Sequence, residues 1–180
     1  EVIYIYDVGS ISIEIVEGNE ELTEMVLANS KNVIEAVLEE VDYDRASKGS
    51  NIKIRVSFNE SMAEIDTSDV EIIKAVVSDS SIEEFEVLKY IDITVEYAID
   101  DGEWKKVSVA KDEIEFTITL PEKYLDNVEK LYMIRCHDGM AEILSDLDIN
   151  DDTITVKSAL YSTYAIAKEP AVTSYEKAAN

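Results

Sequence analysis

The spacing of apolar residues predicts helices in the first part of the chain. In "SKNVIEAVLEEV" (residues 30–41), apolar positions recur at intervals of one, three and four, which is typical of one buried face of an α-helix. The segment "DYDRASKG" (42–49) predicts a second short helical turn, with Gly49 in the left-handed conformation that ends a helix. A further helix is predicted for "SDVEIIKAVVSD", where Ser68 and Glu71 form a candidate capping box.

Strict alternation of polar and apolar residues predicts strands elsewhere. It begins in "NIKIRVSFN" (51–59), which is typical of a strand with one wet face. From residue 85 onward a period of two dominates, and it predicts strands at 90–99, 113–120, 130–137, 140–149, 152–158 and 161–169. Asp101 and Gly102 form the strongest short-range hairpin signal, which predicts a return strand in "WKKVSV" (104–109). Pro121 ends a strand because proline cannot donate to a ladder.

These patterns predict a fold of the α+β class. We expect an antiparallel, β-sandwich-like carboxyl half with one solvated face, and two or three short helices from the amino-terminal third. We expect a single module over residues 1–168, with 1–82 (mixed α/β) and 83–168 (all-β) as candidate subdomains, followed by a linker over 169–180.

The charge restricts the range of partners. The chain has 40 Asp and Glu residues against 16 Lys and Arg residues, for a formal net charge of −24. Such a surface repels phosphate backbones and anionic lipids, so we expect no nucleic-acid partner and no membrane contact by this segment. A single cysteine excludes an internal disulfide.

The segment "IRCHDGMAEIL" holds the only cysteine and the only histidine, Cys136 and His137, followed by Asp138. Three such residues suggest a nucleophile, a base and an orienting carboxylate. However, neighbouring residues on a strand point to opposite faces, whereas a nucleophile and its base must come within about 3 Å of each other. We therefore expect Cys136 to be a small core residue and the imidazole of His137 to point outward.

Asp138 and Gly139 predict a two-residue type I′ hairpin, because both residue types accept a positive φ. The resulting register pairs Cys136 with Ala141, and it places Arg135 opposite Glu142 as a cross-strand ion pair. The residues to which we assign structural roles are Asp138, Gly139, Asp101, Gly102 and Cys136.

The segment "DLDINDDTITVK" (146–157) imitates a calcium loop. Its candidate ligands are Asp146, Asp148, Asn150 and Asp152. Two positions break the pattern, because Asp151 stands where the turn requires glycine and Lys157 where a bidentate glutamate is needed. We interpret the segment as a strand, a polar turn and a return strand, and we expect no metal or other cofactor.

Lys89 falls in phase with Val87 and Ile91, on what should be the apolar side of a strand. One explanation is a break or bulge before Tyr90, which would place Lys89 outside the strand. The alternative is an intramolecular Lys–Asn isopeptide crosslink, which would lower the mass of the chain by one ammonia.

Two features of the sequence relate to the hydrolysis or binding of carbohydrate. The abundance of acidic residues supplies many carboxylate pairs, so a pair by itself does not indicate glycoside hydrolysis. Trp104 and the 10 tyrosines could line a sugar-binding surface, although Tyr90 and Tyr97 fall in strand patterns that favour packing roles.

Several segments together resemble a domain repeated in large surface proteins of Gram-positive gut bacteria. They are "YIDITVEYAIDDGEWKKVS", "EIEFTITLPEKY", "LYMIRCHDG…AEIL…DTITVKSALYSTYAIAKE" and the lead-in "VIEAVLEEVDYDRASKGSNIKIRVSF". The likeness covers residues 8–168, and "HDG" and "STYAIA" are its most specific words. Cys136 replaces an aliphatic residue of the family pattern, and no LPxTG-like motif follows Pro170.

The resemblance implies a secreted, cell-wall-associated protein, with neighbouring domains of the same longer chain as partners, and it carries over no catalytic residues. We therefore expect a non-catalytic extracellular spacer module that supports adhesion. A module that binds carbohydrate or a host surface protein is the alternative, and a hydrolase comes third.

Overall fold

The computed structural model describes residues 2–8, 10–17 and 24–172, with the backbone alone described for residues 2–8. In chain order, its elements are β1 (Val2–Val8), β2 (Ile11–Glu17), β3 (Glu24–Leu27), α1 (Ser30–Val37), α2 (Glu40–Ser47), β4 (Ile52–Asn59), α3 (Thr67–Asp79), β5 (Glu86–Ile99), β6 (Lys105–Lys106), β7 (Val109–Thr119), the 3-10 turn η1 (Glu122–Tyr124), β8 (Val128–His137), β9 (Met140–Ser145), β10 (Thr153–Leu160) and β11 (Thr163–Pro170).

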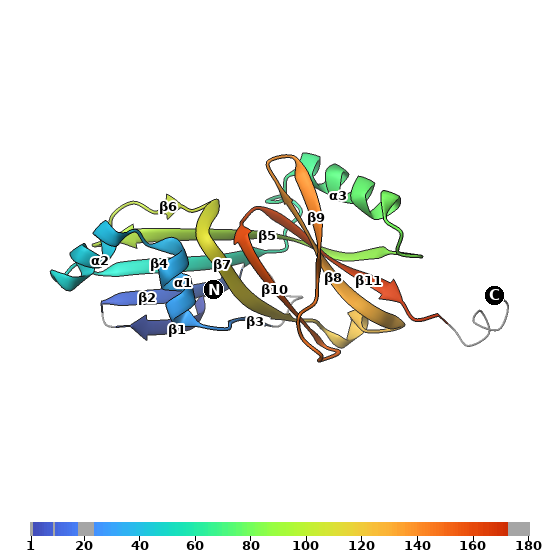
Figure 1. Cartoon of the computed structure of the whole chain (residues 1–180), viewed down its shortest axis with the longest axis horizontal. Helices are drawn as coiled ribbons and strands as arrows, with labels where there is room; N and C mark the ends of the chain where they lie inside the picture. Colours follow the sequence, from blue (N-terminus) through green and yellow to red (C-terminus); the bar gives the residue numbers. More distant parts are fainter. Residues whose placement is uncertain (1, 9, 18–23, 173–180) are drawn as a thin grey trace.

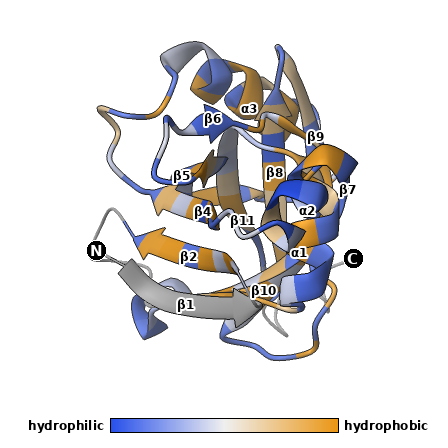
Figure 2. Ribbon diagram, turned by 90° about the vertical axis from the view of Figure 1, so that its left-hand side faces the viewer, coloured by the Kyte–Doolittle hydropathy of each residue, from blue (hydrophilic) through white to orange (hydrophobic). Residues whose placement is uncertain are grey.

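The described strands form two sheets. The large sheet has the order β1-β2-β4-β5-β11-β8-β9, and β6 pairs with the end of β5. The small sheet has the order β10-β7-β3, and its strands β7 and β10 cross the large sheet (Figure 1). Helix α1 packs against β7, whereas α3 contacts β5, β8, β9 and β11. Figure 2 shows α1, α2 and β7 on one side of β2 and β4.

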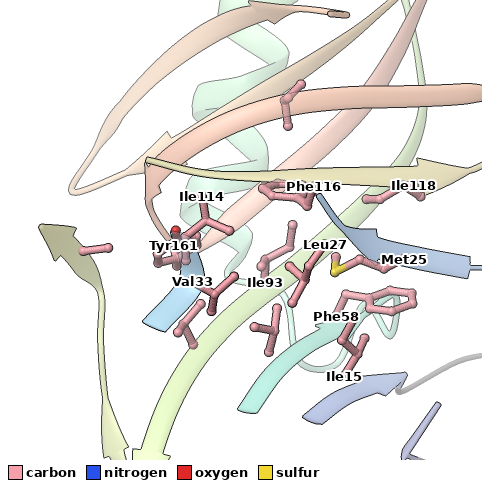
Figure 3. Close-up of a cluster of buried hydrophobic side chains, with 14 of the residues drawn as sticks. Ile15, Met25, Leu27, Val33, Phe58, Ile93, Ile114, Phe116, Ile118 and Tyr161 are labelled. Atoms are coloured by element: carbon pink, nitrogen blue, oxygen red, sulfur yellow. The ribbon is translucent and has the colours of Figure 1, made fainter. Parts of the chain in front are cut away.

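The main core lies between the large sheet, the small sheet and α1. Phe116 and Ile114 of β7 point toward Val33 of α1 and Ile93 of β5 (Figure 3), and all four are buried. The apolar face predicted for "NIKIRVSFN" is on this side, since Ile52, Ile54, Val56 and Phe58 alternate with half-exposed residues. The period of two in the sequence therefore marked the residues that form this core.

The α+β class and the sandwich-like arrangement are confirmed, and the described strand pairs of the carboxyl half are antiparallel as expected. Two features of the large sheet were not expected. First, β2 and β4 pair in parallel, with Ile13 opposite Ile54. The long connection between them carries α1 and α2, as a parallel crossover requires. Second, β8 and β11 are buried on both faces, because α3 covers the side that the small sheet does not.

The helix predicted over residues 30–41 is divided into two. Leu38 has φ −87° and ψ 143°, an extended conformation that ends α1 while its side chain stays in the core. Glu39 and Asp42 form a capping box that starts α2, so Asp42 is inside this helix. Val41 leaves the predicted apolar stripe and is 55% exposed. Gly49 follows α2 with φ +102°, the left-handed stop that the sequence predicted.

Both predicted hairpins are present, one of them shifted by a residue. Asp138 and Gly139 have φ +48° and +75°, and they join β8 to β9 in the predicted register. In the other turn the positive φ values belong to Asp100 (+51°) and Asp101 (+57°). Asp100 is favoured there because its carboxylate accepts hydrogen bonds from Asn51 N (2.8 Å) and Ser50 Oγ (2.9 Å).

Gly102 has a steric role in that second turn. Its backbone N donates to Ile99 O at 2.9 Å, which closes the turn, and an added Cβ would lie 2.9 Å from the same oxygen. The glycine is therefore required by the close approach of the backbone, since its own φ is not in the left-handed range.

The two halves of the chain share one sheet and one core. Strand β4 of the first half pairs with β5 of the second over eight residues, and the main buried cluster runs from Ile11 to Ile166. Strand β11 extends to Pro170, two residues into the predicted linker, whereas residues 173–180 lie outside the described part of the chain.

The β8–β9 turn gives a direct test of the fold. We expect Gly139→Val to lower the free energy of unfolding by about 1–2 kcal/mol, because a β-branched residue is strained in the left-handed region. Gly139→Asn should retain most of the stability, since asparagine tolerates this conformation. Urea unfolding measures both, and equal losses for the two variants would contradict the role of backbone conformation.

Candidate functional site

Cys136 is fully buried on the face of β8 that meets α3. Its thiol donates to Asp69 Oδ1 at 3.4 Å. Burial, and then the adjacent Asp69 carboxylate, raise the pKa of Cys136 to about 12. The thiol is therefore protonated at neutral pH, which is the opposite of what a nucleophilic cysteine needs.

His137 is on the other face of β8, so its imidazole and the thiol of Cys136 do not meet. The expectation that it points outward is wrong, because the residue is only 9% exposed. The face that carries Arg135 and His137 is turned toward β10, where the Arg135 Nη1 donates to Ser158 Oγ at 2.9 Å. His137 Nε2 lies 3.5 Å from the exposed carboxylate of Asp138.

Asp69, which the sequence did not single out, connects α3 to the sheet. It is the third residue of α3, and its Oδ2 accepts hydrogen bonds from Thr163 Oγ1 (2.7 Å) and Ser162 Oγ (3.3 Å). The helix begins at the N-cap Asp66, whose carboxylate accepts from Ser68 N at 2.8 Å, so the predicted Ser68–Glu71 capping box is wrong. A sequence pattern could mark Asp69 as an acid in a first helical turn, but not as a partner of Thr163.

Asp92 adjoins this cluster. The backbone register places it on β5 opposite Thr163, which in turn pairs with Cys136. Burial raises the pKa of Asp92, the carboxylates of Glu64 and Asp69 raise it further, and the ammonium of Lys106 acts in the opposite direction. Two neighbouring carboxylates thus differ in environment, because Asp69 is hydrogen-bonded by hydroxyl donors whereas burial dominates at Asp92.

The opposite face of β8 carries a second polar network. Arg135 Nη2 lies 2.5 Å from Glu142 Oε2, in the cross-strand position that the hairpin register predicted. Ser158 Oγ also accepts from Tyr164 Oη at 2.7 Å, and Tyr161 Oη donates to Ser158 O at 2.7 Å. Burial raises the pKa of both tyrosines, so their hydroxyl groups stay protonated and act as structural donors.

Lys89 lies within β5, contrary to the expectation that it falls outside the strand. It pairs with Ile166, and the register shifts between this pair and the next, as at a β-bulge. Its Nζ lies 3.4 Å from Oε1 of Glu60, whose side chain is only 1% exposed. A buried carboxylate therefore accompanies the lysine on the apolar side, and the isopeptide crosslink stays a prediction.

The acidic loop between β9 and β10 uses its carboxylates internally. Asp146 Oδ1 accepts from Asp148 N (3.0 Å) and Thr155 N (2.9 Å). Asp148 accepts from Asn150 N (2.8 Å), Thr153 Oγ1 (2.9 Å) and Thr155 Oγ1 (2.6 Å). Among the residues that the structure describes, no group of three His, Cys, Asp or Glu side chains is arranged to hold a metal ion.

Trp104 covers the outer face of the large sheet, where its ring lies 3.7 Å from the guanidinium carbon of Arg55. Glu14 and Glu96 flank the same guanidinium, each at 3.8 Å. Of the tyrosines whose side chains are described, only Tyr43 is exposed. The described aromatic residues therefore do not gather on one exposed edge of a sheet.

Comparisons of the chain with models of protein families, with curated proteins and with solved structures found no match. Within the described ranges, no helix has the length and apolar character needed to cross a bilayer.

The environment of Cys136 predicts its reactivity. In the native protein we expect the thiol to react with Ellman's reagent at least ~100-fold more slowly than in urea, because it is buried and protonated. The matched control is Cys136→Ala combined with Met140→Cys, which moves the thiol to a site that is 76% exposed and should react rapidly when folded. Fast modification of native Cys136 would contradict the buried placement.

Asp92 predicts a pH dependence of stability. The pKa of Asp92 is raised in the folded protein, so the folded state holds the carboxyl proton more tightly than the unfolded state does. The free energy of unfolding therefore falls as the pH rises above about 3.9, the ordinary pKa of an aspartate. Asp92→Asn should therefore stabilise the protein at pH 7, and the gain should disappear toward pH 4. Urea unfolding across this range measures the effect.

The matched control is Asp66→Asn, which keeps a residue type able to cap α3. Hydrogen bonds from Ser68 lower the pKa of Asp66, so its contribution has the opposite sign, and its loss should destabilise the protein at pH 7. Parallel pH profiles for the two variants would contradict the assigned environments.

Proposed function

We propose that the chain is a non-catalytic structural module of an extracellular, cell-wall-associated protein, where it acts as a spacer that supports adhesion. The observation that carries the proposal is that several carboxylates of the described residues are used in contacts within the fold. Asp69 joins α3 to β11, and Glu60 accompanies Lys89. The loop carboxylates of Asp146 and Asp148 bind their own backbone and the hydroxyl groups of β10.

The place of β11 supports the same role. This strand lies between β5 and β8 and pairs with both in the antiparallel direction. A force along the axis of β11 would load both ladders of hydrogen bonds in shear. The resemblance of residues 8–168 to repeated modules of Gram-positive surface proteins supplies the proposed location and the proposed partners, which are neighbouring domains of the same chain.

The proposal predicts surface exposure on cells and no saturable binding of sugars. Antibodies against the module should label intact cells of the organism that produces it, and external trypsin should remove the label. The isolated chain should give no saturable signal on a glycan array, and micromolar calcium should leave its melting temperature unchanged.

Two results would contradict this assignment. Labelling only after cell lysis would overturn the extracellular location. Saturable glycan binding that is lost in Trp104→Ala, with an unchanged melting temperature, would favour the alternative of a carbohydrate-binding module.

A further inference from the structure

A hollow lies between the start of β8 and the loop that joins β9 to β10. Leu125, Val128 and Leu131 supply apolar lining, and Ile149 stands on the loop side. The carboxylates around it belong to Glu129, Asp146, Asp148 and Asp151, whereas the basic side chain that lines it is Lys130. The hollow thus combines an apolar floor with a strong excess of negative charge.

Ile149 is 97% exposed, and its neighbour Leu147 is 56% exposed. Their exposure follows from the way in which the loop is held. Leu147 N donates to Thr155 O at 2.9 Å, and Asp148, just before Ile149, accepts hydrogen bonds from two residues that follow it, Asn150 N and Thr153 Oγ1. The loop is fixed by these bonds while it presents two aliphatic side chains to solvent beside the hollow.

The carboxylates fit a bulky organic cation better than a metal ion. Asp146 and Asp148 already accept hydrogen bonds from N–H and O–H donors, so a metal would have to displace these donors. A lysine or arginine side chain needs only the negative field and a free carboxylate at the rim, and its aliphatic stem can lie on apolar surface.

We propose that this hollow docks a basic peptide segment of a partner protein, in which lysine or arginine is flanked by aliphatic residues. The aliphatic side chains of the peptide contact Ile149 and the apolar floor, and its cationic groups face Asp151 and Glu129. This interaction adds to the structural role proposed above and does not depend on where the protein is located.

The test uses a fluorescently labelled peptide of alternating lysine and leucine, with fluorescence anisotropy as the readout. A peptide of alternating lysine and serine lacks the aliphatic residues, and a peptide of alternating glutamate and leucine lacks the positive charge. The two peptides together show whether binding needs both properties. We expect Ile149→Ser to weaken binding of the first peptide about tenfold, because serine cannot supply the apolar surface that the isoleucine buries on docking. Asp151→Asn should weaken it several-fold.

Control variants separate docking in the hollow from general attraction to an acidic protein. Val109→Ser removes another exposed aliphatic residue, at the start of β7, and Glu103→Gln removes a carboxylate beside the β5–β6 turn. Both should bind the peptide as the unchanged chain does. The proposal would be overturned if the two hollow variants and the two control variants all bound the peptide equally well. It would also be overturned if the peptide did not bind, or if micromolar calcium displaced it.

Discussion

The burial of both faces of β8 and β11 is the constraint on which the arrangement of the layers depends. On one face Tyr164 and Ile166 meet the main core, and the ring of Tyr164 packs edge-on against Phe116 at 6.1 Å. On the other face Ala165 and Ala167 lie beneath α3, and such small side chains let the helix approach the strand closely. The same eight-residue strand therefore supports a sheet on one side and a helix on the other.

Double coverage leaves little solvent for the polar groups that these layers contain, and several of them find partners within the fold, whereas Nδ1 of His137 has none among the described residues. Unpaired buried donors and charges cost about 1–3 kcal/mol or more each, which makes incomplete networks unfavourable. Asp69 meets the hydroxyl group of Thr163 on the α3 side, and Arg135 meets Ser158 on the other. Polar residues that the sequence did not mark as chemical candidates thus connect the layers.

Local features were predictable, whereas long-range ones were not. The turn at Asp138 and Gly139 depends on two adjacent residues, and its register followed from the sequence. The prediction that His137 points outward was wrong, because the sequence pattern of β8 does not show that its second face is also covered. The contact of Asp69 with Thr163 joins residues 94 positions apart, and no periodicity reports such a contact. The parallel pairing of β2 with β4 likewise depends on where the intervening helices pack.

The net charge of −24 opposes the compact state, because like charges repel one another. Burial is the main cause of the raised pKa values of Asp92 and Asp146, and neighbouring carboxylates raise both further. Apolar burial in the core offsets the cost, so stability alone does not account for so many acidic residues. An acidic surface instead favours solubility and discriminates among partners by sign. Negative charge repels anionic polymers and attracts cationic segments, and in the docking that we propose the exposed Ile149 beside the hollow adds apolar contact to that selection.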